Sequence, residues 1–259
     1  MGGQSAACPD LLIYSAYDSA EMQASGVINN TALYGTSSLN QVFLKNSQEA
    51  IWQVQPVNIG WNTPDAQIFI LSPASPMTGT LNPVYLSPQI LAAFEPGDRR
   101  RTNWIDSVTA NGIIYYYPYK YKSATFNAPV TEYEMILRLG EQYLIRAEAR
   151  ARQNNIPGAQ ADLNLIRTRA GLSSTTANDQ SALLAVIGHE RQAELFTEWG
   201  HRWLDLKRSG EIDAVIAFFS FLPAERSMPF SMPVVPKSSY WYGTGMDLPC
   251  IYWGDFGRT

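Results

Sequence analysis

The sequence lacks the residues that several common kinds of site require. Its 259 residues include two cysteines and two histidines, too few for a disulfide framework or a cysteine and histidine metal cluster. Charged residues make up only 16% of the chain, the formal net charge is −4 and no basic run is present, so nucleic-acid binding has little support. No stretch of about 18 apolar residues occurs, which argues against a membrane-spanning helix. The hydrophobic content of 46% and the length are those of a globular chain with one or two domains.

The C-terminal half has the spacing of two antiparallel helices. Over residues 132–153, apolar and small residues recur three or four positions apart, as they do on one face of a helix. Residues 154–158 interrupt this pattern, because Pro157 is tolerated only in a first helical turn. A second periodic segment runs to Gly171, so the two predict an αα-hairpin of the tetratricopeptide type. Such a hairpin needs a further helix to cover its apolar face, and residues 17–27 have a similar spacing.

A third helix is predicted to begin near Asp179 and to continue beyond Trp199. The charged and aromatic residues of its C-terminal part are Glu190, Arg191, Glu194, Glu198, Arg202, Trp203, Asp205 and Arg208. His189 and Glu190 begin a zinc-binding helix motif, but that motif needs a histidine four positions after the first, where this chain has Ala193. We therefore predict a structural ion-pair network with Trp199 and Trp203 as packing anchors, and no metal, cofactor or catalytic site.

Residues 33–130 differ in character from both helical parts. Pro, Gly, Asn, Ser and Thr are frequent, and helical periodicity disappears. Short apolar or aromatic runs at 49–54, 68–71 and 113–117 predict short strands set in long loops. A loop-rich span of this length usually carries function when it is ordered.

Aromatic residues are dense in this loop-rich region. Aromatic faces stack on the apolar faces of sugar rings, while amide and charged side chains bond the hydroxyls, so the mixture suits a carbohydrate site. The alternative is that these large rings are core residues. Trp61, in a polar loop, is the best candidate for an exposed ring, and Trp104 is the next. The candidate ligand-binding residues are Trp61, Asn62, Tyr85, Asn103 and Trp104.

Five segments in a fixed order resemble one protein family. They read FLKNSQEAIWQ at 43–53, FEPGDRR at 94–100, YLIRAEA at 143–149, DLNLIRTRAGL at 162–172 and ERQAELFTEWGHRWLDLKRSG at 190–210. This ordered set is similar to the SusD/RagB family of nutrient-binding proteins of the bacterial outer membrane. The similarity covers about residues 17–215.

The resemblance implies a mainly α fold, in which tetratricopeptide-like helical hairpins support a loop-rich region with short strands. It also implies a non-catalytic lipoprotein at the cell surface, in the outer membrane, that needs no cofactor. Such proteins bind oligosaccharides, or in some members peptides, and deliver them to a SusC-like TonB-dependent transporter. Ligand-binding residues differ between members of the family, so the resemblance assigns none to this chain.

The expected organisation has four parts: a remnant helix of a tetratricopeptide-like repeat at 1–32, a loop-rich aromatic region at 33–130, a helical core at 131–216 and an atypical tail at 217–259. Cys8 follows Ser-Ala-Ala, as in a lipoprotein signal, but neither a charged start nor an apolar core precedes it, so we do not expect it to be a lipid anchor. Our hypothesis is that the chain is the C-terminal portion of an interrupted reading frame.

Two other functions stay open at this stage. One is a tetratricopeptide-type scaffold that binds a protein partner. The other is a glycoside hydrolase, for which Asp65, Asp98 and Asp106 could supply the paired carboxylates.

Overall fold

The structure, a computed structural model, describes residues 12, 15–74 and 84–215. Cys8 and the tail at 217–259 lie outside the described residues. The described part of the chain is largely helical, with two small antiparallel sheets, so the mainly α fold class is confirmed. Among these residues, no helix is both long and apolar enough to cross a membrane.

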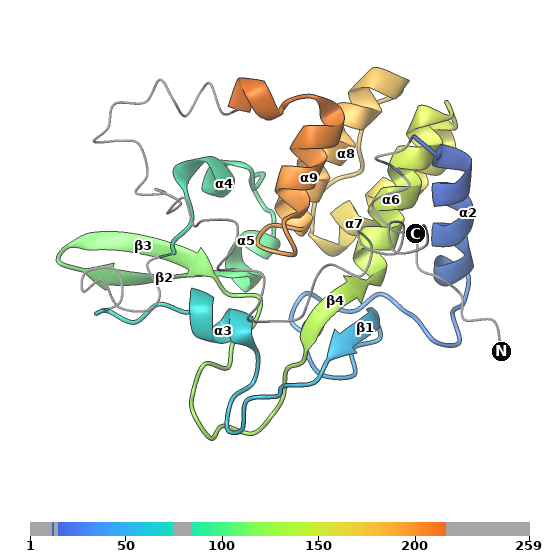
Figure 1. Cartoon of the computed structure of the whole chain (residues 1–259). Coiled ribbons are helices and arrows are strands. Elements are labelled where there is room, and N and C mark those ends of the chain that lie inside the picture. The colour runs from blue at the N-terminus through green and yellow to red at the C-terminus, as the bar shows by residue number, and fades with distance from the viewer. Residues whose placement is uncertain (1–11, 13–14, 75–83, 216–259) are drawn as a thin grey trace, which may run out of the picture.

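Helices α6, α7 and α8 form the centre of the helical part (Figure 1). They span Leu139–Arg152, Ile156–Arg169 and Gln180–Glu194. Their common core consists of buried aliphatic and alanine side chains, namely Leu144, Ala147, Ala151, Ala159, Leu163, Ile166, Leu183 and Ile187. Alanine at these positions lets the backbones approach closely, and each buried leucine or isoleucine stabilises the fold by about 1.5–3 kcal/mol.

Local sequence sets the ends of these helices. The Asn155 side chain accepts a hydrogen bond from the Gly158 amide at 3.1 Å, and Pro157 lies in the first turn of α7. Gly171 follows the end of α7 with a φ of +83°, a conformation that glycine adopts without strain. Asp179 caps α8 by accepting from the Ala182 amide at 2.9 Å. The predicted αα-hairpin is therefore confirmed.

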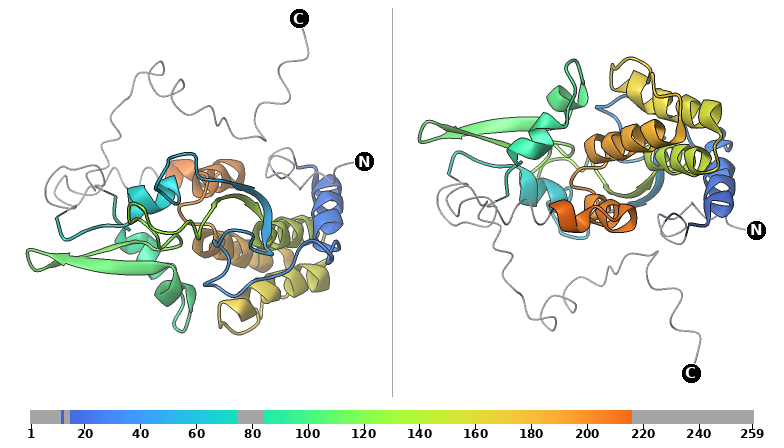
Figure 2. Two further views of the ribbon diagram at one scale, coloured as in Figure 1. Left: turned by 90° about the horizontal axis from the view of Figure 1, so that it is seen from below. Right: turned by 90° about the horizontal axis from the view of Figure 1, so that it is seen from above.

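Helix α2, Tyr17–Ile28, packs against α6 (Figure 2). Its buried Ala20, Ala24 and Val27 meet Ile145 and Ala149 of α6. These are the residues whose spacing indicated a covering helix, so the hairpin's apolar face is partly covered by this chain itself.

Two helix boundaries differ from the prediction. Residues 132–138 do not begin a helix, because Glu134–Arg138 form strand β4, which pairs antiparallel with β1, Ala50–Val54. A short apolar run has the same appearance in a buried strand and a helix, and the pairing with a distant strand decides the outcome. The third helix ends at Glu194 rather than beyond residue 199. Thr197, Trp199 and Gly200 have positive φ, which breaks the helix before α9 begins.

The loop-rich region contains fewer strands than expected. Strand β2, Ile105–Ala110, and strand β3, Ile113–Pro118, form a hairpin with Asn-Gly at its turn, both residues having positive φ. The strands expected at 49–54 and 113–117 are thus present as β1 and β3. The strand expected at 68–71 is wrong, because Thr63 caps helix α3, Pro64–Phe69, and proline occupies its first turn.

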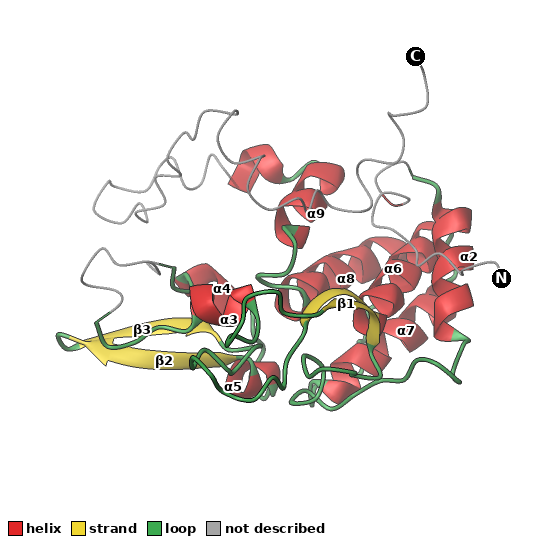
Figure 3. Cartoon of the chain, turned by 60° about the horizontal axis from the view of Figure 1, so that its bottom comes forward, coloured by secondary structure: helices red, strands yellow, loops and turns green. Residues whose placement is uncertain are grey.

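The hairpin lies on the opposite side of the molecule from α2, α6 and α7 (Figure 3). The short helices α4, Pro88–Ala92, and α5, Arg100–Asn103, and the helix α9, His201–Ser209, complete the described elements. A second core, in which aromatic and aliphatic residues are mixed, lies in this part of the fold, and it includes Phe43, Phe94, Trp104, Tyr121, Met135 and Phe196.

Candidate functional site

Trp61 and Phe126 form an exposed pair of rings on two neighbouring loops. Their ring centroids lie 5.3 Å apart with an angle of 50° between the ring planes. Trp61 is partly exposed and Phe126 is 57% exposed. We call this pair the aromatic platform. Phe126 was not among the candidate residues chosen from the sequence, because nothing local in a long loop indicates which ring faces solvent.

Backbone contacts bring the two loops together beside the platform. The Asn127 amide donates to the Gly60 carbonyl at 2.7 Å. Gly60 has a φ of +84°, and a Cβ there would lie 2.6 Å from the Phe126 ring. Glycine is therefore required at residue 60 both by its backbone conformation and by the close approach of the second loop.

Asn62 is buried between the same loops rather than exposed to a ligand, with 1% of its surface accessible. Its Nδ2 donates to Ser123 Oγ at 2.9 Å and to the Pro129 carbonyl at 3.2 Å. Its Oδ1 accepts from the amides of Thr131 at 2.8 Å and Glu132 at 3.0 Å. The amide of Asn62, one of the five candidate ligand-binding residues, is therefore buried and already fully bonded within the chain.

Trp104 is fully buried, so its expected exposure is also wrong. Its indole Nε1 donates to the Leu39 carbonyl at 2.9 Å, and its ring contacts Phe43 edge-on at 5.6 Å. Neighbouring Asn103 is partly exposed, and its Nδ2 donates to the Arg99 carbonyl at 2.7 Å. These two residues stabilise the second core and α5.

Tyr85 packs on the β2–β3 hairpin rather than on the platform. Its ring lies 5.2 Å from that of Tyr115 in an edge-on contact, and both rings are partly exposed. The Arg101 guanidinium lies 4.6 Å from the centroid of the next ring, Tyr116. Of the five candidate residues, the structure therefore leaves Trp61, Tyr85 and Asn103 accessible, and it does not gather them into one site.

Hollows occur elsewhere on the described surface. The largest described pocket, about 700 Å³, lies between α4, α8 and α9 and has largely apolar walls that include Leu86, Ile90, Phe196 and Leu206. The one aromatic ring among these, Phe196, is already engaged edge-on by Phe94 at 5.5 Å. Polar side chains also line this pocket, namely Ser87, Gln89, Gln192, Thr197, Arg202 and Glu211, but it offers no free aromatic face on which a sugar ring could stack.

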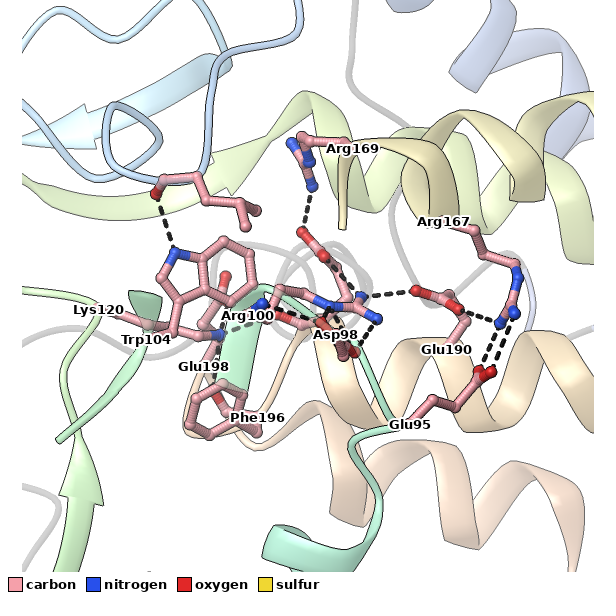
Figure 4. Close-up of polar contacts among 12 residues, drawn as sticks. Glu95, Asp98, Arg100, Trp104, Lys120, Arg167, Arg169, Glu190, Phe196 and Glu198 are labelled. Atoms are coloured by element: carbon pink, nitrogen blue, oxygen red, sulfur yellow. Dashed lines mark hydrogen bonds and ion pairs between the residues drawn. The ribbon is translucent and has the colours of Figure 1, made fainter. Parts of the chain in front are cut away.

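The dense charges of α8 form a buried ion-pair network with arginines from three other segments (Figure 4). Glu194 is completely buried, and its carboxylate contacts Arg100 at 2.9 Å, Arg138 at 2.7 Å and Arg169. Glu190 contacts Arg100 at 2.6 Å. The spacing of four residues places these carboxylates along one side of α8, where they meet cations.

Lys120 belongs to the same network, and aromatic rings surround its ammonium group. Its Nζ donates to the carbonyls of Glu194 and Phe196, both at 2.8 Å, and to the Glu198 carboxylate. The ammonium group also lies 4.2 Å from the centroid of the Phe196 ring and 5.0 Å from that of Trp104. Lys120 thereby satisfies carbonyls at the end of α8, and the sequence did not single it out.

Neighbouring cations keep the carboxylates of Glu194 and Glu198 charged. Burial alone would raise the pKa of Glu198, but Arg138 and Lys120 lower it to about 2. Burial would likewise raise the pKa of Glu194, and the nearby arginines hold it below its usual value. For Lys120, burial is the larger effect and lowers the pKa to about 8. The lowered pKa values of Glu194 and Glu198 therefore come from neighbouring cations, which is the behaviour of a structural ion-pair cluster, whereas that of Lys120 comes from burial.

The remaining residues of the charged motif divide into paired and exposed ones. Arg191 contacts Asp205 at 2.8 Å, and Arg208 contacts both Asp205 at 2.9 Å and Glu148. Arg202 is exposed and Trp203 is 52% exposed. Trp203 is therefore not the packing anchor that its type indicated, because it lies on the outer face of α9.

The three aspartates considered for glycoside hydrolysis are engaged by different partners. Asp98 contacts Arg100 at 2.8 Å inside the buried network. Asp106 accepts a hydrogen bond from the Tyr117 hydroxyl at 3.2 Å. Asp65 lies on α3, so no two of the three form a carboxylate pair.

Asp65 instead lies near the Glu134 carboxyl group of β4, and the two carboxyl groups affect each other's pKa. Burial raises the pKa of Asp65 to about 6 and that of Glu134 to about 8. The cavity beside Asp65 has a volume of about 10 Å³, which holds about one water molecule and no sugar ring. This pair is therefore not arranged as a hydrolytic centre. Among the described residues, no group of histidine, cysteine and carboxylate side chains could hold a metal ion.

Comparison with known proteins gives a consistent result. Residues 96–228, just over half of the chain, match the model of the SusD family. A SusD superfamily protein from Bacteroides vulgatus has a TM-score of 0.63 at 18% identity, covering 78% of this chain and 51% of that one. A SusD superfamily protein from Bacteroides thetaiotaomicron has a TM-score of 0.62 at 22% identity, covering 81% and 50%. Surface glycan-binding protein A from Bacteroides uniformis has a TM-score of 0.57 at 18% identity, covering 78% and 48%. No curated protein matches the sequence.

Fold and site together define a helical scaffold that is locked by buried ion pairs and presents aromatic loops at its surface. The chain belongs to the SusD family. It spans about half the length of the solved structures that it matches. The family match continues to residue 228, into the segment at 217–259 that was expected to be atypical.

Proposed function

We propose that this chain is a non-catalytic glycan-binding protein and that the aromatic platform contacts the sugar. The observation that carries the proposal is the pair of rings of Trp61, partly exposed, and Phe126, 57% exposed, which two clamped loops hold together. A rigid aromatic surface offers large contact area at low entropic cost. A carbohydrate-binding role also agrees with family membership and with structural relatives named surface glycan-binding protein A.

The exposed apolar residues near the platform support a protein partner as well. Val57 is 84% exposed and Ile59 is 96% exposed, both in the loop that leads to Trp61. Aliphatic side chains do not recognise sugar hydroxyls, and two of them exposed in one loop suit a contact with a protein. We assign this contact to a SusC-like TonB-dependent transporter at the outer membrane, to which the glycan would be delivered.

Affinity gel electrophoresis tests the glycan proposal. The chain is run through gels that contain soluble starch, xylan, inulin, arabinan, pectic galactan or mucin, and retardation is measured against a gel without polysaccharide. Trp61→Ala and Phe126→Ala should each weaken the retention by about tenfold or more, as for a central aromatic contact. Trp203→Ala is the control, because it removes a tryptophan that is 52% exposed on α9 and is not part of the platform.

Two outcomes would contradict this proposal. Retention that is lost equally in Trp203→Ala would show that the platform is not the site. Release of shorter saccharides during incubation with a retained polysaccharide would show that the protein is an enzyme. For the partner, Val57→Ser and Ile59→Ser should reduce co-purification with a co-expressed SusC-like transporter while leaving the retention by polysaccharide unchanged.

A further inference from the structure

Asn62 has no free hydrogen-bonding group with which to contact a ligand. An asparagine amide offers two N–H donors and an oxygen with two lone pairs. All four are used within the chain: Ser123 Oγ and the Pro129 carbonyl accept, and the amides of Thr131 and Glu132 donate. The side chain is 1% exposed. All hydrogen bonds of the Asn62 side chain are therefore made with the second loop.

The four bonds join the two loops that carry the rings of the platform. Trp61 is the residue before Asn62, and Phe126 lies in the loop whose two sides, at Ser123 and at 129–132, Asn62 contacts. Glu132 extends the same clamp, since its carboxylate accepts from the backbone amides of residues 122 and 123 at 2.7 and 3.1 Å. Without the amide, the closest remaining backbone tie between the two loops is the Asn127-to-Gly60 bond.

We infer that Asn62 is a positioning residue, which fixes the relative placement of Trp61 and Phe126 so that the platform is formed before a glycan arrives. The inference rests on the proposed function for its effect on affinity, although the positioning itself does not depend on any ligand. A preformed surface binds more tightly because the cost of ordering the loops has already been met during folding.

The test compares Asn62→Ala with Asn164→Ala in the full chain. Asn164 is the matched control, because its Oδ1 holds a loop elsewhere by accepting from the Thr175 amide at 2.7 Å. Each protein is produced with 5-fluorotryptophan, and the fluorine resonance of Trp61 is assigned by its loss in Trp61→Phe. Affinity is measured with the polysaccharide that retains the wild-type chain most strongly.

In Asn62→Ala, the Trp61 resonance should move and broaden, and the affinity should fall by about tenfold while both rings are still present. In Asn164→Ala, both should stay as in the wild type. If Asn62→Ala does not fold, Ser123→Ala removes a single bond of the clamp and should give the same changes at a smaller size.

The outcomes separate this inference from the proposed function. A wild-type chain retained by no polysaccharide refutes the proposed function, and the fluorine resonance then decides the positioning role alone. An unmoved Trp61 resonance in Asn62→Ala overturns the positioning role. An affinity loss without movement of that resonance overturns it too, because Asn62 would then contact the glycan directly.

Discussion

The strongest prediction concerns Glu194, the carboxylate at the centre of the buried network. Glu194→Gln keeps the shape of the side chain and removes its charge, so no cavity is created. Arg100 at 2.9 Å, Arg138 at 2.7 Å and Arg169 then lose their common counter-charge in a place without solvent. Removing one partner of a buried ion pair costs about 3–5 kcal/mol, because it leaves the other charges uncompensated.

The assay is urea-induced unfolding followed by circular dichroism at pH 7. Glu95→Gln is the matched control, since the Glu95 carboxylate contacts Arg167 at 2.6 Å but is 38% exposed. An exposed pair of this kind contributes about 0.2–1 kcal/mol. A cost for Glu194→Gln within about 1 kcal/mol of the wild type, or one no larger than that of Glu95→Gln, would refute the argument that burial sets the magnitude.

The same substitution should change how stability depends on acid. The neighbouring Glu198 has a usual pKa of 4.5, which Arg138 and Lys120 lower to about 2 against the opposing effect of burial. A carboxylate with a lowered pKa contributes stability above its unfolded pKa and loses it as the pH falls through the folded one. The pKa of Glu194 is lowered too, so the free energy of unfolding should fall from pH 4.5 downward, and less steeply in Glu194→Gln.

Three further predictions follow from other parts of the fold. The pKa of Glu134 is raised from 4.5 to about 8, so its contribution to the free energy of unfolding is complete at low pH and is lost as the pH rises to about 8. Asp65→Asn should make the free energy of unfolding depend less steeply on pH between pH 5 and 9. Gly171→Ala should lower the free energy of unfolding by more than about 1 kcal/mol, since its φ is +83° and the new Cβ would lie 2.8 Å from an arginine side chain; an unchanged value would contradict this. Trp104→Ala should cost about 3–5 kcal/mol, whereas Trp203→Ala should cost within about 0.5 kcal/mol, and equal urea midpoints for the two would contradict their difference in burial.

Much of the helical part could be predicted because its signals are local. The α6–α7 hairpin follows from periodicity, from Pro157 in a first turn and from Gly171 after the last turn. Helix α3 could have been predicted in the same way, since Thr63 followed by proline is a helix start. The apolar run at 68–71 favours a strand only when this cap is left out of account.

The rest depends on contacts between residues far apart in the chain. Strand β4 exists because it pairs with β1, more than 80 residues earlier. Trp104 is buried because Leu39, 65 residues away, accepts its indole hydrogen bond. Asn62 is a clamp because its partners lie 61 to 70 residues later. Without these pairings, neither ring exposure nor the role of a polar loop residue can be read from the sequence.

The spacing of Glu190 and Glu194 on α8 has a consequence for how the chain folds. Like charges four residues apart destabilise an isolated helix, so the end of α8 gains stability only when its cations arrive. Those cations come from α5, β4 and α7, segments that are brought together from as far as 94 residues apart. Contacts of such long range form slowly, and the last of them completes the helix. We therefore expect a single late step in refolding, in which α8, the sheet and the loop-bearing region become native together.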